Sequence, residues 1–93
     1  MNIYLISQDV NNEYDTYDSA VVAAVNEYEA KRTYPSPFRI FVEDVLYFNY
    51  GDSISSQEVS SGDWTSNPND VDVELIGTTT KEAGVILASF NAG

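Results

Sequence analysis

The run TYDSAVVAAV, from Thr16 to Val25, is the segment from which the expected fold can be built outward. Its first half alternates, so that Tyr17 and Ser19 share one face with Val21, while Asp18 and Ala20 belong to the other, because successive side chains of a strand point to opposite sides. Its second half is almost entirely apolar. The run therefore predicts a β-strand whose end is buried on both sides.

A short helix is predicted directly after this strand. Asn26 is a good N-cap residue, and Glu29 stands three positions later, as in a capping box. Pro35 and Pro37 prevent the helix from continuing, which leaves room for about two turns, and so short a helix needs support from a sheet. Three side chains are expected to rest on that sheet: Tyr28, Ala30 and Tyr34.

A first strand is predicted before the central run, from Asn2 to Ser7, because β-branched and aromatic residues dominate there. The polar residues from Gln8 to Asp15 predict a loop. After the helix, Phe38 to Val42 alternates as a third strand does, and Val45 to Tyr50 continues it beyond a bend or bulge at Glu43 and Asp44. A helix across residues 42–48 is the alternative interpretation.

The residues from Ser53 to Asn69 predict a long polar loop with room for one weak edge strand. Trp64 is expected to anchor this loop to the core, since a large aromatic residue in a polar stretch is most simply a buried anchor. Farther on, Val71 to Ile76 predicts a strand with Val73 and Leu75 facing inward.

The last predicted strand runs from Val85 to Phe90 and is apolar apart from Ser89. Such a run is typical of a central strand, covered on both faces or paired on both edges. Taken together, these segments predict a single domain over residues 1–93. Its fold class is α+β, with an antiparallel sheet of about five strands and one short helix packed on a face.

The composition is strongly acidic, with 15 Asp and Glu against 4 Lys and Arg, no His and no Cys, and a net charge of −11 at pH 7. This charge disfavours direct binding to nucleic acid or to anionic membranes, because few cations are available to neutralise phosphate. The usual acid–base and nucleophilic groups of enzymes are missing, so we expect a binding protein rather than an enzyme. No cofactor is expected.

The loop at residues 11–18 is rich in Asn, Asp and Glu, whose oxygen atoms are ligands that hard cations such as calcium prefer. The pattern lacks the glycine and the closing glutamate of a calcium loop, so no metal site is predicted. The amino terminus has no signal-peptide pattern and no apolar run approaches the roughly 20 residues that cross a bilayer, which predicts a cytoplasmic protein.

Acidic side chains recur at every second position near the end of the polar loop. Asp70, Asp72 and Glu74 are expected on one strand face about 6.6 Å apart, from a rise of about 3.3 Å per residue. Asp15 and Asp18 could extend this row into a stripe that resembles a line of phosphates. Two tyrosines beside these acids are candidate interface anchors: Tyr14 and Tyr17. An ordinary solvated strand face is the simpler interpretation of the same residues.

Three segments resemble a group of small acidic proteins of phages and bacteria: YLISQDVNN (residues 4–12), YDTYDSAVVAA (residues 14–24) and GVILASFNAG (residues 84–93). They cover about a third of the chain. The group carries no activity that can be transferred, so the resemblance implies a mobile-element origin and no site. Small acidic phage proteins are often inhibitors of host defence, including anti-CRISPR proteins and DNA mimics.

The leading hypothesis is a phage or prophage protein that inhibits a host nucleic-acid-binding defence machine by covering its basic surface. It would act in the cytoplasm of the host as a monomer or small homo-oligomer. The alternative is a small structural or assembly protein that associates with itself through sheet edges and tyrosines. An enzyme working through carboxylates is the third hypothesis, and it would need a deep pocket with an acid of raised pKa.

Overall fold

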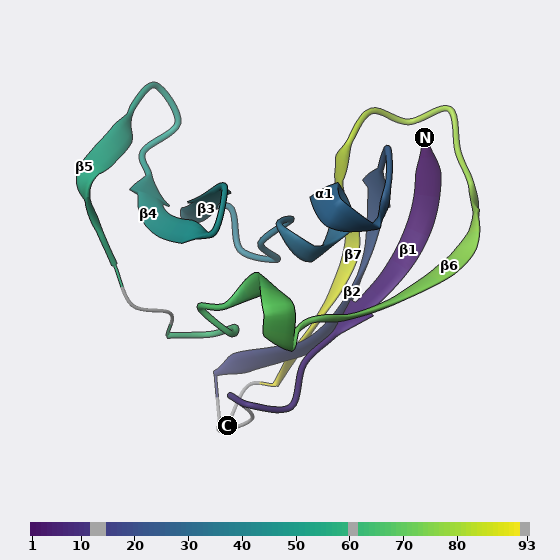
Figure 1. Ribbon diagram of the computed structural model, residues 1–93, viewed down its shortest axis with the longest axis horizontal. Helices are drawn as coiled ribbons and strands as arrows, with labels where there is room; N and C mark the ends of the chain where they lie inside the picture. The colour runs from purple at the N-terminus through teal and green to yellow at the C-terminus, as the bar shows by residue number, and fades with distance from the viewer. Residues whose placement is uncertain (12–14, 60–61, 92–93) are drawn as a thin grey trace.

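The computed structural model describes residues 1–11, 15–59 and 62–91, and Figure 1 shows two antiparallel sheets with one short helix between them. The elements follow in this order: β1 (Asn2–Ser7), β2 (Thr16–Ala24), α1 (Glu27–Lys31), β3 (Arg39–Val42), β4 (Val45–Asn49), β5 (Ile54–Glu58), the 3₁₀ helix η1 (Pro68–Asp70), β6 (Asp72–Thr78) and β7 (Gly84–Asn91).

The strands form a four-stranded sheet of order β6-β1-β2-β7 and a three-stranded sheet of order β3-β4-β5. All neighbouring strands in both sheets are antiparallel. The predicted α+β character with antiparallel strands is therefore confirmed. The expectation of about five strands in one sheet is wrong, because the described residues contain seven strands in two sheets.

The centre of the larger sheet is the pair β1 and β2, whose register runs from Asn2 opposite Ala24 to Ser7 opposite Ser19. Both strands were predicted to within one residue. Alternation along them buries Tyr4 and Ile6 on the inner face, which is the side on which α1 and the second sheet lie (Figure 1). No described element covers the opposite, outer face, which carries Leu5 and its cross-strand neighbour Val21.

The helix α1 begins as the sequence predicts, because the side chain of Asn26 accepts a hydrogen bond of 2.9 Å from the backbone N–H of Glu29. The helix has only five residues, fewer than the expected two turns. Ala30 and Tyr34 are buried, as predicted. Tyr28 does not rest on the sheet: it is 53% exposed, and the guanidinium of Arg32 lies 3.6 Å from the centre of its ring.

Residues 39–49 form a hairpin rather than one bent strand or a helix. Val42 lies opposite Val45, so Glu43 and Asp44 are a two-residue turn. Glu43 has a φ of 57°, the left-handed conformation that tight hairpin turns require. The turn escaped prediction because neither residue is a Gly or Asn, the usual signals for such a turn.

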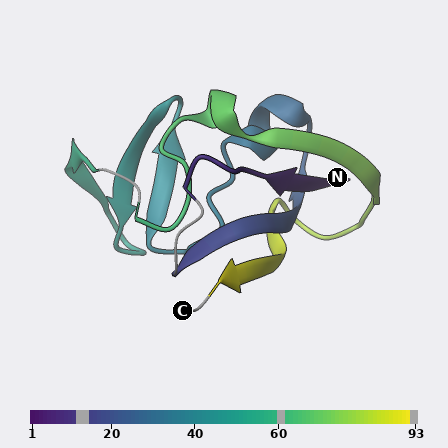
Figure 2. The same ribbon diagram turned by 90° about the horizontal axis from the view of Figure 1, so that it is seen from below.

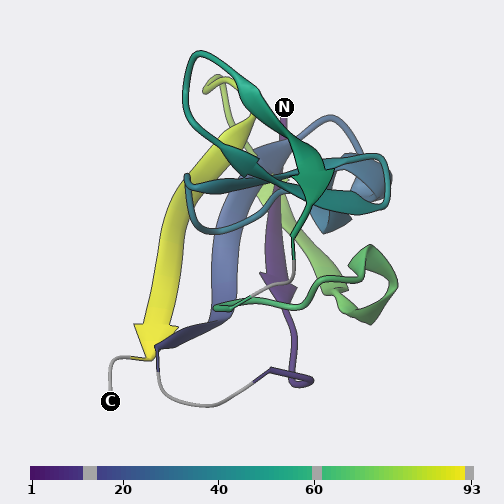
Figure 3. The same cartoon turned by 90° about the vertical axis from the view of Figure 1, so that its left-hand side faces the viewer.

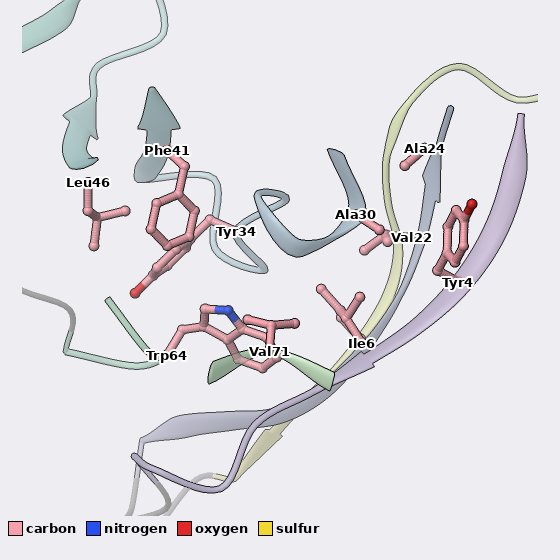
Figure 4. Close-up of a cluster of buried hydrophobic side chains, with 11 residues drawn as sticks. Tyr4, Ile6, Val22, Ala24, Ala30, Tyr34, Phe41, Leu46, Trp64 and Val71 are labelled. Carbon is pink, nitrogen blue, oxygen red and sulfur yellow. The ribbon is translucent and has the colours of Figure 1, made fainter. Parts of the chain in front are cut away.

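Trp64 anchors the polar segment as predicted, and its side chain is fully buried. Figure 4 shows it between Phe41 and Leu46, which come from the hairpin, and Ile6 of the larger sheet. The two sheets therefore share one apolar cluster through this residue. The weak edge strand considered for the same segment is β5, at the edge of the smaller sheet.

The strand β7 differs most from its prediction. It lies at the outer edge of the larger sheet, beside β2, rather than in the centre (Figures 2 and 3). Leu87 is 67% exposed and Phe90 is 47% exposed. An apolar strand is buried only if other elements cover its faces or pair with both of its edges. The position of a strand within the sheet depends on contacts with other strands, which its own sequence does not reveal.

The strand β6 is the other edge of this sheet. Val73 packs against the core, and Leu75 lies opposite the buried Tyr4, so both face inward as predicted; Leu75 is nevertheless 57% exposed. A register shift opposite Ile3 and Tyr4 leaves Ile76 as an extra residue in β6. At this edge the one-turn helix α1 is the nearest cover, and it is too short to bury the whole strand.

Candidate functional site

Asp72 and Glu74 are the part of the predicted acidic row that the structure places together. Asp72 lies opposite Ser7 and Glu74 lies opposite Leu5 on the neighbouring strand β1. Cross-strand partners share a face, so both carboxylates belong to the outer face of the sheet. Both residues are exposed, and their side chains are about 6.6 Å apart along the strand, from its rise per residue.

Asp70 does not continue this row. It belongs to the 3₁₀ helix η1, and its Oδ2 accepts a hydrogen bond of 3.3 Å from the hydroxyl of Thr65. The strand that carries Asp72 and Glu74 begins only two residues later. The alternation expected through residues 70–74 therefore holds for two carboxylates rather than three.

Asp18 and Asp15 lie at the same end of the sheet as Asp72. Ser7 of β1 pairs with Asp72 of β6 on one side and with Ser19 of β2 on the other. Asp18 precedes Ser19 in β2, so it lies two strands away from β6, or roughly 10 Å. Asp18 is the extra residue of a β-bulge and is exposed. Asp15 precedes β2, is exposed, and has a φ of 62°.

Of the two tyrosines predicted as interface anchors, the structure describes only Tyr17. Tyr17 packs against the core, and its ring meets that of Phe90 edge to face at 4.8 Å between centroids. It is therefore half-buried and held against β7, and its role as an interface anchor stays a prediction. Tyr14 lies outside the described residues.

Two residues that sequence reasoning missed organise this end of the sheet. Gln8 is buried: its Nε2 donates to the carbonyl of Tyr17 at 2.9 Å, and its Oε1 accepts from the backbone N–H of Asn11 at 2.8 Å. Asp63 accepts a hydrogen bond from the hydroxyl of Tyr34, and its carbonyl accepts from the N–H of Tyr17 at 2.7 Å. Nothing in the local pattern distinguished either residue from its polar neighbours.

The basic residues lie elsewhere on the chain. Lys31 and Arg32 are at the end of α1, Arg39 is in β3, and Lys81 is in the connection between β6 and β7. Within the described ranges, the one salt bridge joins Arg32 to Asp44, with an Nε to Oδ1 distance of 3.0 Å. The carboxylates of Asp15, Asp18, Asp72 and Glu74 therefore have no cation paired with them in the part of the chain that the structure covers. We call these four residues the acidic edge.

The other edge of the same sheet has the opposite character. Gly84 to Asn91, the whole of β7, contains no charged residue. Its outer-face residue Leu87 continues the apolar strip formed by Leu5 and Val21, and these three side chains line a shallow hollow of ≈ 300 Å³. The larger sheet thus presents one charged edge and one uncharged edge.

Among residues 1–11, 15–59 and 62–91, no three side chains of metal-binding type lie close enough together to hold an ion. The loop at residues 11–18, rich in Asn, Asp and Glu, lies partly outside those ranges. No helix in the described part of the chain has the length and apolar character needed to cross a membrane. No family model, curated protein or solved structure matches this chain.

Proposed function

We propose that this chain is a small acidic binding protein that occupies the basic surface of a nucleic-acid-binding protein. The observation that carries the proposal is the acidic edge: Asp72 and Glu74 project from an edge strand, with Asp18 and Asp15 at the same end, and among the described residues no cation is paired with any of the four. The resemblance of the two ends of the chain to small acidic phage proteins favours a host defence protein, such as a CRISPR effector in the cytoplasm, as the partner.

Electrostatics gives this surface a definite role. A net charge of −11 on 93 residues attracts a basic groove over the Debye length, about 8 Å at physiological salt, and accelerates encounter. Charged groups on an exposed rim act mainly on the association rate and on its salt dependence. Binding through the acidic edge should therefore be fast, and it should weaken as salt is added.

The effect of reversing this charge can be estimated. A pair of unit charges about 5 Å apart in water interacts by about 0.8 kcal/mol. Replacing Asp72 and Glu74 with lysine changes four units of charge, which amounts to about 3 kcal/mol before screening and roughly half of that at 0.15 M salt. The expected increase in Kd lies between about 10-fold and 200-fold.

The test is affinity capture of host proteins at low salt by the tagged chain, followed by release with short duplex DNA. A partner held through its nucleic-acid-binding surface is released by the DNA. The double variant Asp72→Lys/Glu74→Lys should lose that partner. The matched control is Asp52→Lys/Glu58→Lys, which changes the net charge equally, from −11 to −7, at exposed residues of or beside β5.

Two results would contradict the proposal. If both double variants weaken capture equally, net charge matters and the acidic edge does not. If the captured partner stays bound when DNA is added, it is not held through a nucleic-acid-binding surface. Equal melting temperatures of the two variants and the unmodified chain would establish that any loss of binding is not a loss of folding.

A further inference from the structure

The free edge of β7 is an unusual surface for a protein of this charge. An exposed edge strand presents unpaired N–H and C=O groups, and natural proteins protect such edges with lysine, proline or inward-pointing charges. The strand β7 has none of these residues between Gly84 and Asn91. The opposite edge strand, β6, carries Asp72 and Glu74.

The free part of β7 is regular enough to pair with another strand. Val21 lies opposite Leu87 and Val22 lies opposite Val85, so a bulge at Ile86 interrupts the first half of the strand. From Leu87 to Asn91 every residue of β7 has a partner in β2, and the one further bulge in this stretch is in β2, where Asp18 is the extra residue. Five consecutive residues therefore lie beyond the bulge, which is close to the usual length of a strand.

We propose that β7 pairs antiparallel with β7 of a second copy of this chain about a two-fold axis. The pairing joins two four-stranded sheets into one continuous sheet of eight strands. Centred on Ser89, it places Ser89 opposite its own copy and Ala88 opposite Phe90 of the other chain. This inference goes beyond the proposed function and does not depend on it.

The side chains of β7 suit such a self-pairing. Ala88 and Phe90 lie two residues apart in the strand, so their side chains share one face. This is the inner face, because Ala88 packs against the core and the ring of Phe90 contacts Tyr17, which also packs against the core. Phe90 remains 47% exposed beside the free edge. Across the two-fold axis, each large Phe90 would cover a small Ala88, and the exchange occurs twice in one interface.

Charge favours a second copy at this edge over any other edge of the sheet. Two chains of net charge −11 repel one another, so they can approach most easily where charges are absent. Of the two edge strands of the larger sheet, only β7 contains no charged residue, because β6 carries two carboxylates. The carboxylate of Asp18 lies one strand away from this edge, in β2. Addition of salt should screen the remaining repulsion and strengthen the dimer, which is the opposite of its effect on binding through the acidic edge.

The first test is the mass in solution, measured by sedimentation over a range of protein concentrations at low and at high salt. The proposal predicts growth from 10.3 kDa to twice that mass, 20.6 kDa, and no further. The midpoint of this transition should move to lower protein concentration as salt rises. A chain that remains monomeric up to about 1 mM, in the weakest range of specific affinities, would overturn the proposal.

The second test places like charges at the two-fold axis. Ser89→Asp sets two carboxylates directly opposite each other, and Ser89→Lys does the same with two cations, so both should raise the Kd of the dimer by on the order of tenfold or more. Ser56→Asp, at an exposed serine of β5, is the matched control and should leave the dimer intact. Circular dichroism confirms that each variant is folded. A dimer that survives both Ser89 variants would overturn the proposed interface.

The third test is direct cross-linking, for which this chain is well suited because it contains no cysteine. Residues opposite each other in an antiparallel pair have Cβ atoms about 4.5–5.5 Å apart, near the separation that a disulfide bridges. Ser89→Cys should therefore give an oxidised dimer under mild conditions, whereas Ser56→Cys should not. Equal cross-linking of the two variants would indicate random collision and would overturn the assignment of β7.

The two proposals fail separately. Loss of the dimer in Ser89→Asp with unchanged capture of a partner would leave the acidic edge in place. Loss of capture in Asp72→Lys/Glu74→Lys with an unchanged or stronger dimer would confirm that the two edges act independently. If Asp72→Lys/Glu74→Lys abolished the dimer, the copies would meet at β6, and the β7 interface would be wrong.

Discussion

Replacing Trp64 with alanine should remove a large part of the stability of the fold. The indole is fully buried, and it lies where the hairpin β3–β4 meets the larger sheet (Figure 4). Truncation of a buried Trp or Phe to Ala costs about 3–5 kcal/mol, because the apolar contacts are lost and a cavity remains. A chain of 93 residues has a free energy of unfolding of about 5–14 kcal/mol, at 0.05–0.15 kcal/mol per residue. Trp64→Ala should therefore remove between about a fifth and all of it.

The measurement is urea unfolding followed by far-ultraviolet circular dichroism, because Trp64 is the single tryptophan and its fluorescence is lost in the variant. The melting temperature should fall by at least about 12 °C, since 1 kcal/mol corresponds to roughly 4–8 °C for a domain of this size. Trp64→Phe keeps a ring in the cluster and should cost less. Phe38→Ala is the control, because Phe38 is 69% exposed, and its truncation should change stability by no more than about 0.5 kcal/mol.

A loss of less than about 1 kcal/mol for Trp64→Ala would refute the reasoning. It would mean that the neighbouring backbone contacts, such as the hydrogen bond of 3.1 Å from Asn11 Nδ2 to the carbonyl of Trp64, hold the segment without the indole. Equal losses for Trp64→Ala and Phe38→Ala would lead to the same conclusion.

Two further substitutions test local features by the same unfolding assay. Tyr34→Phe removes the hydroxyl that donates to Asp63 and should cost about 1.5–3 kcal/mol, as expected for a hydrogen bond to a charged group; a loss below about 0.5 kcal/mol would show that water replaces the hydroxyl. Glu43→Asn should raise stability by up to about 1 kcal/mol, because Asn tolerates the φ of 57° better than Glu. A lower melting temperature for Glu43→Asn would contradict this account of the turn.

The elements that the sequence predicted correctly are those whose signals are local. The strands β1 and β2 follow from alternation and from β-branched residues within six and nine residues. The start of α1 follows from the single residue Asn26, whose side chain caps the helix as expected. Trp64 followed from contrast with its polar neighbours. In each case the residues that produce the structure are also the residues that display the pattern.

The features that were missed depend on partners distant in the chain. Whether β7 lies at the centre or the edge depends on which strand pairs beside β2, and the apolar run from Val85 to Phe90 reads the same in either place. The turn at Glu43 is imposed by the pairing of β3 with β4 on a residue type that rarely adopts a positive φ. Of the acidic row, Asp72 and Glu74 followed from alternation within one strand. The separate placement of Asp70 depended on its contact with Thr65.

The unequal edges of the larger sheet limit how far self-association could proceed. A sheet with two uncharged edges could add copies at both ends and grow into a filament, as open strand pairing does in fibres. Here a β7 to β7 pairing would consume the uncharged edge of each copy, and both ends of the resulting sheet would be β6 strands carrying Asp72 and Glu74. Further addition would bring like charges together, so the assembly should close at two copies. In that dimer the two pairs of Asp72 and Glu74 would lie at opposite ends of one sheet, both open to a basic partner, whereas Asp18 of each copy would lie one strand from the interface.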